Sequence, residues 1–497
     1  MRRAFAALPA LLLVAGSAAG QDLASFEKNL TLHELDNGLT FLIYQRPVAP
    51  VVSFYTYVDA GSAQEVAGIT GLAHMFEHMA FKGTTRIGTS DWEAEREALE
   101  KVDAAYAALE AERHRHSPDG ERLVELEADW KKAREEAASW VVKDEYSEIV
   151  DRAGGVGMNA TTGSDRTAYY YSLPANKVEL WAYMESERFL DPVMREFYTE
   201  RDVVMEERRL RVESQPVGRL IEQLLAAAFV AHPYGYPGIG YASDIQSYSR
   251  EDARAFYRRH YVPAQMYIAI VGDVDAERLV PMLETYFGRL PAGPPPPPLR
   301  TEEPRPIAER VLRVPDRSQP IYAEAYLRPA VTHPDDAIYD AIADVLSTGR
   351  TSRLYRSLVR DQRIAAATGA FSGFPGTKYP NLMIAYAYPT PGHGNDEVEA
   401  AIRSEIERLK SEPISDQELE MVKTRAKAGL VRSLASNTGI ASQLTYYQAI
   451  FGDWRELFRA VDRIEQVNKE DILRVARETF QPTRRTVGMI VHEEAGS

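Results

Sequence analysis

An internal duplication constrains the fold of this chain more than any other feature of its sequence. Residues 249–271 begin with Ser-Arg-Glu-Asp, continue with a helical pattern, an aromatic residue and a proline, and end in a β-rich run. Residues 468–491 repeat this order, starting from Asn-Lys-Glu-Asp. Ser249 and Asn468 are favourable N-cap residues, and acids suit the first turn of a helix. The sequence therefore predicts two homologous halves, with chance similarity of local signals as the alternative.

A proline-rich segment separates the two copies. Residues 294–298 are all proline, which favours an extended polyproline II conformation without internal hydrogen bonds. We interpret 291–304 as the linker, 21–290 as the N-terminal domain and 305–497 as the homologous C-terminal domain. The chain has 497 residues, which is too long for a single core and agrees with such a division.

Each half mixes short β-rich runs with longer helical patterns. Val51 to Val58 reads as a strand, whereas 72–81 and 178–189 read as helices. This mixture predicts an α+β fold made of two homologous half-domains, each a mostly antiparallel sheet packed with helices.

Residues 91–142 depart from this pattern. They are rich in Ala, Glu, Lys and Arg, contain no β-rich run, and are interrupted once, by the Ser-Pro-Asp-Gly sequence at 117–120. Two helices joined by that turn predict a helical-hairpin insertion in the first half. We expect a solvated insertion without a chemical role; a docking arm for a partner is the alternative.

The first twenty residues read as a secretory signal peptide. Arg2 and Arg3 precede an apolar run at 4–14, and small residues at 16–20 follow it. This order is typical of a signal peptide cleaved near Gly20, with a membrane anchor as the alternative. No later stretch approaches 18 uninterrupted apolar residues, so we expect no membrane span after cleavage. We expect an exported protein, located in a bacterial periplasm.

Composition restricts the chemistry that remains. The chain contains no cysteine, so a zinc site must be built from His, Asp and Glu. The formal net charge is −15, and loss of the two arginines of the signal peptide takes it to −17. This acidic balance argues against a nucleic-acid partner.

The sequence His74-Met75-Phe76-Glu77-His78 carries the strongest chemical signal. Positions i, i+3 and i+4 of a helix share one face, so both histidines and Glu77 point the same way. Two imidazoles one turn apart can bind one zinc ion, and this inverse of the HExxH order is a metallopeptidase signature. The apolar neighbours predict a buried helix, whose polar side chains need partners. The alternative is a pair of hydrogen-bonded core histidines.

A third protein ligand is expected, because catalytic zinc usually takes three and leaves the fourth position to water. The acidic helical stretch 200–209 contains Glu200 and Glu207, which lie seven residues apart on one helix face. Such a pair could supply one ligand and one carboxylate that orients a histidine. From spacing alone, an ordinary charged helix face is the better explanation.

The motif and its surroundings resemble the pitrilysin/insulinase family of zinc peptidases. Residues 71–84 are similar to the zinc helix of that family, 159–169 to its active-site edge strand, 200–207 to its third-ligand helix, and 232–235 to a further family segment. The resemblance covers essentially the whole chain outside the signal peptide and the insertion. It extends to the beta subunit of the mitochondrial processing peptidase and its bacterial relatives.

The resemblance implies roles for individual residues. One zinc ion per chain would be held by His74, His78 and Glu207. Glu77 would be the general base, and Glu200 would orient a ligand. A shift by one place would instead make Glu206, the neighbour of Glu207, the third ligand.

The resemblance also implies how substrate is held and where this chain departs from the family. Asn159 and Ala160 would pair with the substrate backbone by β-addition. The family completes its active site with an Arg and a Tyr seven apart in the second half; Arg360 fits the arginine as a substrate-binding residue, but Ala367 stands at the tyrosine position. A further family acid falls on Val217.

These departures imply a two-subunit assembly. In two-subunit members a metal-free homologue supplies the Arg/Tyr pair, so the resemblance implies a heterodimer, with a homodimer possible. The predicted function is a zinc-dependent endopeptidase that cleaves peptides or unfolded segments. The alternatives are a non-catalytic assembly subunit of the same fold and a zinc-binding or zinc-storage protein.

Overall fold

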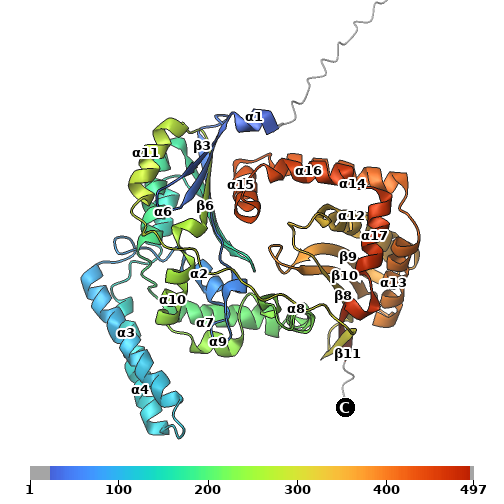
Figure 1. Cartoon of the computed structure of the whole chain (residues 1–497). Coiled ribbons are helices and arrows are strands. Elements are labelled where there is room, and N and C mark those ends of the chain that lie inside the picture. Colours follow the sequence, from blue (N-terminus) through green and yellow to red (C-terminus); the bar gives the residue numbers. More distant parts are fainter. Residues whose placement is uncertain (1–22, 493–497) are drawn as a thin grey trace, which may run out of the picture.

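Each half of the chain forms one mixed sheet covered by helices (Figure 1). The computed structural model describes residues 23–492, and the predicted signal peptide lies outside the described residues. The first sheet has the strand order β1-β2-β6-β3-β5-β4 and the second has the order β7-β11-β8-β10-β9. In each sheet one neighbouring pair is parallel, β2 with β6 and β7 with β11, and the others are antiparallel. The predicted α+β class with mostly antiparallel sheets is confirmed.

The strands have the following bounds. The first sheet contains β1 (Leu30–Glu34), β2 (Thr40–Gln45), β3 (Val51–Val58), β4 (Val156–Thr162), β5 (Thr167–Pro174) and β6 (Met266–Gly272). The second contains β7 (Arg310–Asp316), β8 (Ile321–Arg328), β9 (Ala365–Phe374), β10 (Asn381–Pro389) and β11 (Arg485–His492).

The two halves repeat one topology, as the sequence predicts. Without β1, the first sheet matches the second strand for strand. The matching helices α10 (Arg250–His260) and α17 (Lys469–Thr479) each precede the inner parallel strand, β6 or β11. Ser249 and Asn468 cap them, each accepting a hydrogen bond from the backbone N–H three residues later.

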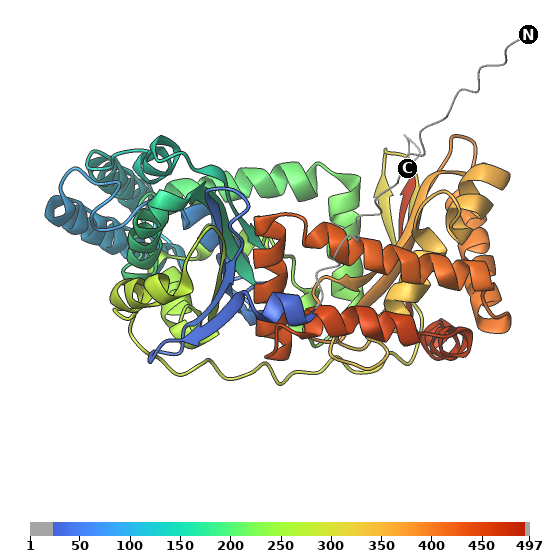
Figure 2. The ribbon, with the colours of Figure 1, turned by 90° about the horizontal axis from the view of Figure 1, so that it is seen from above.

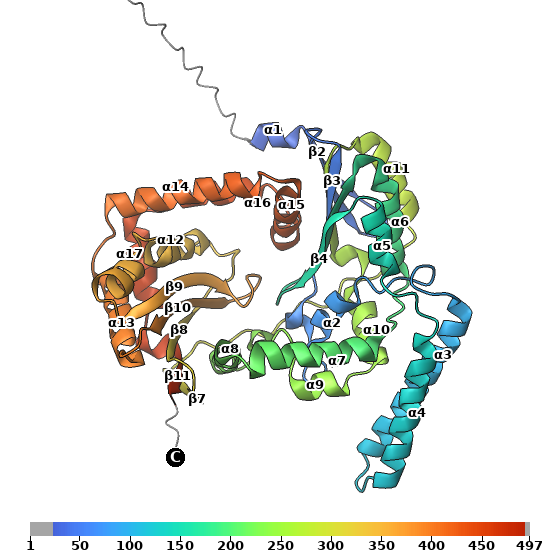
Figure 3. The same cartoon turned by 180° about the vertical axis from the view of Figure 1, so that it is seen from behind.

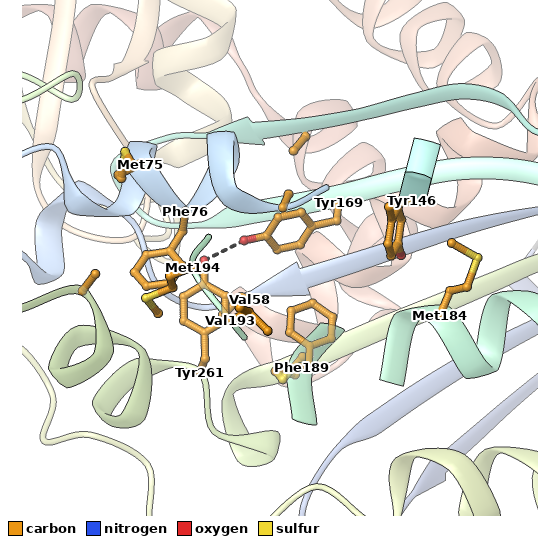
Figure 4. Close-up of a cluster of buried hydrophobic side chains, with 14 of the residues drawn as sticks. Val58, Met75, Phe76, Tyr146, Tyr169, Met184, Phe189, Val193, Met194 and Tyr261 are labelled. Atoms are coloured by element: carbon orange, nitrogen blue, oxygen red, sulfur yellow. Dashed lines mark hydrogen bonds between the residues drawn. The ribbon is translucent and has the colours of Figure 1, made fainter. Parts of the chain in front are cut away.

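One face of each sheet packs against helices of its own half. Over the first sheet lie α2 (Leu72–Met79), α6 (Val178–Leu190), α10 and α11 (Ala276–Phe287), and over the second lie α12 (Asp336–Ser347), α13 (Asn395–Ser411) and α17. Alternation along β3 explains the layering, since Val52, Phe54 and Val58 enter this core. Figure 4 shows part of it, in which Phe76 of α2 lies beside Tyr169 and Tyr261.

The opposite face of each sheet is covered by a helix from the other half. Helix α8 (Pro216–Ala228) of the first half packs on the second sheet, where Leu224 and Leu225 join a core with Ala325 and Ile384. Gly488 of β11 allows this approach, because a Cβ there would lie 3.0 Å from Leu220 of α8. Helix α8 therefore completes the core of the second half.

The second half likewise supplies a helix that covers the opposite face of the first sheet. Helix α15 (Asn437–Phe451) packs on β3 and β6 of the first sheet. Its Ile440 and Leu444 join Tyr55 and Tyr57, which alternate along β3 with the residues of the other core. Seen from above, the halves lie side by side with these helices between them (Figure 2).

Two further features lie outside the sheets and their covering helices. Residues 92–138 form α3 (Trp92–Arg113) and α4 (Gly120–Ala138), a hairpin that projects from the first half (Figure 3). Residues 291–307 contain no helix or strand, and the yellow segment at the bottom of Figure 2 runs from one half to the other. None of the described helices is long and apolar enough to cross a membrane.

The exchange of helices predicts a large effect of one substitution in α15. We expect Leu444→Ala to lower the free energy of unfolding by about 3 kcal/mol, because the side chain is fully buried between the halves and its loss leaves a cavity. Val431→Ala, at a residue 68% exposed on the preceding helix, should change it by less than about 0.5 kcal/mol. Chemical denaturation of both variants measures the difference, and equal values would contradict the prediction.

Candidate active site

The N-terminus of helix α2 is held by the side chain of Glu65, which lies six residues before the N-cap. Gly71 at the N-cap adopts φ 91° and offers no side chain to the free backbone N–H groups. The buried carboxylate of Glu65 takes that role, accepting from Gly71 N at 2.8 Å and Ala73 N at 2.7 Å. Burial raises the pKa of Glu65 to about 8, although these hydrogen bonds oppose the shift. The first turn of α2 is thereby held in place immediately before His74.

Three side chains from two helices converge beside α2. His78 Nε2 lies 3.1 Å and His74 Nε2 3.7 Å from the same oxygen, Oε2 of Glu207. Glu207 belongs to α7 (Phe197–Arg208), which packs on α2. One ligand atom from each residue falls within 4.8 Å of the others, and no second cluster of three such residues occurs within 23–492.

The structure distinguishes Glu207 from its neighbour Glu206. The Glu206 carboxylate pairs with Arg209 and is 54% exposed. Glu207 is only 17% exposed and faces both histidines. One helix position rotates a side chain by about 100°, so only one of the two can face α2.

Charged partners hold the side chains of this cluster; Glu200 was predicted for this role, whereas Lys82 and Arg211 were not singled out by the sequence. Glu200 Oε2 lies 3.5 Å from His78 Nδ1, and Lys82 Nζ lies 2.5 Å from the other Glu200 oxygen. Arg211 lies 2.7 Å from Oε1 of Glu207, the oxygen that does not face the histidines. Each candidate carboxylate thus has one oxygen toward a histidine and one toward a cation.

The two histidines have opposite electrostatic surroundings. Burial lowers the pKa of His74 to about 4, with Glu207 opposing the shift, so His74 is neutral at physiological pH. The hydrogen bond to Glu200 raises the pKa of His78. Burial works to raise the pKa of Glu200, but hydrogen bonds from His78 and Lys82 outweigh it and hold the pKa below its ordinary value.

Glu77 lies on the same helix but contributes no atom to the cluster. It is half-buried, and burial raises its pKa above the ordinary value, with hydrogen bonding from Thr162 opposing the shift. Thr162 ends β4, so the carboxylate lies between the cluster and the edge of the first sheet. A half-buried carboxylate at this place is suited to accept and release a proton.

Asn159 and Ala160 lie on β4, the outermost strand of the first sheet. Within residues 23–492 the strand pairs with β5 alone, so its other edge has no strand partner there. The register shifts between Val156 and Asn159, the Asn159 side chain is exposed, and Ala160 is buried. Asn159 accepts a hydrogen bond from Ala160 N at 2.9 Å. An extended peptide could add to this edge.

Arg360 is not brought to this cluster. It lies in the helical turn Tyr355–Asp361, is about half exposed, and pairs with the adjacent Asp361. That turn precedes β9, whose far end carries the loop that meets the first half. A ten-residue strand spans roughly 30 Å. Both Arg360 and Ala367 lie near the end of β9 that is remote from this loop. The substrate-binding role of Arg360 therefore stays a prediction.

The chain is similar to known proteins over both of its halves. The family model described as Insulinase (Peptidase family M16) matches residues 40–114 and 139–240, and Peptidase M16 inactive domain matches 247–426. Zinc protease PqqE of Helicobacter pylori is 26% identical over 447 residues, covering 88% of this chain and 86% of that protein.

Two solved structures share the fold. A protease from Helicobacter pylori has a TM-score of 0.77 at 24% identity, covering 93% of this chain and 99% of the other. The first half of the periplasmic protease PqqL from Escherichia coli has a TM-score of 0.68 at 18% identity, with 94% and 92% covered. The two family models together extend over both halves of the chain and omit residues 115–138, which form the turn of the hairpin and α4. This chain belongs to the pitrilysin/insulinase family of peptidases, peptidase family M16.

Proposed function

We propose that this chain is a zinc-dependent endopeptidase that cleaves peptides or unfolded segments of proteins. The observation that carries the proposal is the convergence of three ligand atoms from α2 and α7 beside a half-buried carboxylate on the same helix. The relatives named zinc proteases support the same reading.

The donor set fits zinc. Two imidazole nitrogens and one carboxylate oxygen form the usual three-ligand set of a catalytic zinc site, which leaves the fourth position open. Because the pKa of His74 is lowered to about 4, its lone pair is available to a metal near pH 7. We propose His74, His78 and Glu207 as the ligands of one zinc ion per chain. Glu200 would orient His78 through Nδ1, and Arg211 would keep Glu207 bound through a single oxygen.

Glu77 would act as the general base. Zinc, when bound, polarises a carbonyl oxygen and lowers the pKa of water beside it toward neutrality. The Glu77 carboxylate accepts the proton that water loses and returns it to the nitrogen of the leaving amine. Its raised pKa makes the carboxylate a stronger base toward water than an ordinary glutamate.

The free edge of β4 would hold the substrate. Backbone pairing with Asn159 and Ala160 fixes the register of an extended peptide without reading many side chains. A segment must be unfolded to add to a sheet edge, which favours peptides and unfolded chains over folded proteins. A bulged register on β4 leaves the strand with a local distortion beside the site.

A second candidate is a non-catalytic subunit of the same fold. The match of residues 247–426 to an inactive-domain model favours it for the second half. The His-His-Glu cluster and Glu77 in the first half favour the catalytic alternative. We propose that this chain is the catalytic subunit, that a metal-free homologue supplies the Arg/Tyr pair missing at Ala367, and that the assembly is periplasmic.

The ligand assignment predicts different effects for two adjacent glutamates. We expect Glu207→Gln to weaken zinc binding by at least about 100-fold, since even the outer partners of a ligand contribute roughly 10- to 100-fold. Glu206→Gln is the matched control and should bind zinc like the unmodified chain, because Glu206 pairs outward with Arg209. Titration of the metal-free chains with zinc measures both. Weaker binding in the Glu206 variant alone would reverse the assignment.

The mechanism predicts that hydrolysis and zinc binding separate at Glu77. We expect Glu77→Gln to keep one zinc per chain while kcat falls by roughly 10²- to 10⁴-fold, the usual contribution of general acid–base catalysis. Metal analysis and peptide cleavage on the same sample test this, with Glu206→Gln as the control for activity. Full cleavage by the Glu77 variant would refute the proposed base, and loss of zinc would show a structural role instead.

The alanine at position 367 predicts dependence on a second subunit. We expect the zinc-loaded chain alone to cleave peptides weakly, and addition of a metal-free family member carrying an Arg/Tyr pair to raise kcat by roughly 100-fold or more, the usual effect of one hydrogen-bond donor to the transition state. The same homologue with its tyrosine replaced by phenylalanine is the control. Full chelator-sensitive activity without a partner would show that the chain is self-sufficient.

A further inference from the structure

A loop of the second half reaches the first half beside the candidate active site. The loop joins β9 to β10 and lies between the two halves, near the tip of β4 in Figure 3. Its backbone N–H groups at Thr377 and Lys378 donate to one carboxylate oxygen of Asp165, at 2.7 and 3.1 Å. Asp165 belongs to the turn that joins β4 to β5 and is 8% exposed. The second half therefore contacts the turn at the end of the edge strand.

The same carboxylate receives a third donor. The hydroxyl of Tyr234 donates to the other Asp165 oxygen, and it also accepts from Tyr379 N at 3.3 Å. Tyr234 lies in the short turn Pro233–Gly235, and the buried side chain of His232 accepts from its backbone N–H. Asp165 thus links three segments, one of which belongs to the second half. A buried carboxylate with three donors is strongly held, since charge-assisted hydrogen bonds are about twice as strong as neutral ones.

A second contact fixes the loop at a neighbouring point. Lys378 Nζ lies 2.7 and 2.6 Å from the two oxygens of Asp59, which follows β3 directly and is 8% exposed. Gly376 of the loop passes so close to Asp165 and Tyr234 that a Cβ there would lie 2.6 and 2.5 Å from their oxygens. The loop therefore has little freedom to move against the first half.

The turn that carries Asp165 is coupled to the catalytic helix. Two residues of the turn accept hydrogen bonds from the segment before α2, from Ser62 N to Gly163 O at 3.2 Å and from Ala63 N to Ser164 O at 2.9 Å. At the end of β4, the Thr162 hydroxyl lies 3.4 Å from the Ala73 carbonyl oxygen, and Thr162 also contacts Glu77. Movement of the turn would therefore move both the substrate edge and the surroundings of the base.

We infer that Asp165 is a positioning residue through which the second half holds the edge strand β4 at a fixed position relative to the zinc helix α2. The second half then takes part in the reaction without contributing a catalytic group, by fixing the strand that receives the peptide. The inference rests on the proposed function for its effect on cleavage, whereas its effect on β4 itself is independent of any activity.

The experiment compares three variants of the full chain. Asp165→Ala removes the acceptor, and Tyr234→Phe removes one donor hydroxyl while leaving the ring. Tyr236→Phe is the matched control, because Tyr236 is two residues away and its hydroxyl makes no hydrogen bond within the described residues. For each variant, amide hydrogen exchange of residues 156–162, zinc affinity with the metal alone, and KM and kcat for an unstructured peptide are measured.

We expect Asp165→Ala to speed exchange in 156–162 by about tenfold and to raise KM by a similar factor, the effect of losing a hydrogen-bonded charge. Zinc affinity should stay within about twofold of the unmodified chain, since the ligands lie on α2 and α7. Tyr234→Phe should change the exchange rate and KM in the same direction by a smaller factor. It tests the inference by itself if Asp165→Ala does not fold. A loss of zinc binding in step with KM would indicate general damage to the site and would overturn the inference.

Exchange and KM in both variants equal to those of Tyr236→Phe would also overturn it. If the unmodified chain binds no zinc and cleaves nothing, the proposed function fails. The exchange of β4 still decides whether Asp165 positions the strand.

Discussion

The arrangement of this molecule depends on the apolar face that each sheet presents to the other half. A sheet buried on only one side would leave a second face of Tyr, Ala, Val and Ile side chains in water, which costs about 25 cal/mol for each Å² of apolar surface. Helix α15 covers that face in the first half and α8 covers it in the second. Neither core is complete without a helix from the other half. The β9–β10 loop adds a polar contact between the same two halves, through the hydrogen bond of Thr377 N to Asp165.

Within this frame, the candidate site is organised by the need of buried charges for partners. His78, Glu200 and Lys82 form one chain of contacts, and Glu207 with Arg211 forms another. A carboxylate placed between a histidine and a cation has only one oxygen available to a metal. The result is a set of side chains with fixed orientation before any ion binds. Glu65 adds to it by holding the first turn of α2, where glycine at the cap supplies no side chain.

Local patterns in the sequence predicted individual strands, helices and caps, but they did not predict features that depend on contacts between residues distant in the chain. The strand bounds 51–58, the helical hairpin at 92–138 and the paired caps Ser249 and Asn468 follow from periodicity, turn residues and capping chemistry. The approach of Glu207 to the histidines was implied by a resemblance, because a helix face of acids alone does not specify a metal. The crossing of α8 and α15 had no local signal, since an amphipathic helix does not encode which sheet it covers. The same holds for Asp165, whose partners lie up to 213 residues away.

Because each half is covered by a helix of the other, the proline-rich linker is not needed to hold the assembled halves together. In a swapped dimer, identical subunits hold each other by trading one element, and this chain has the same geometry with both subunits joined in a single polypeptide. The linker raises the effective concentration of the halves during assembly, whereas α8 and α15 keep the halves together afterwards. A chain nicked between the two halves would thus be a complementation pair rather than two independent fragments. Either half expressed alone would expose the sheet face that its missing helix covers, and would present that face to the solvent and to other chains.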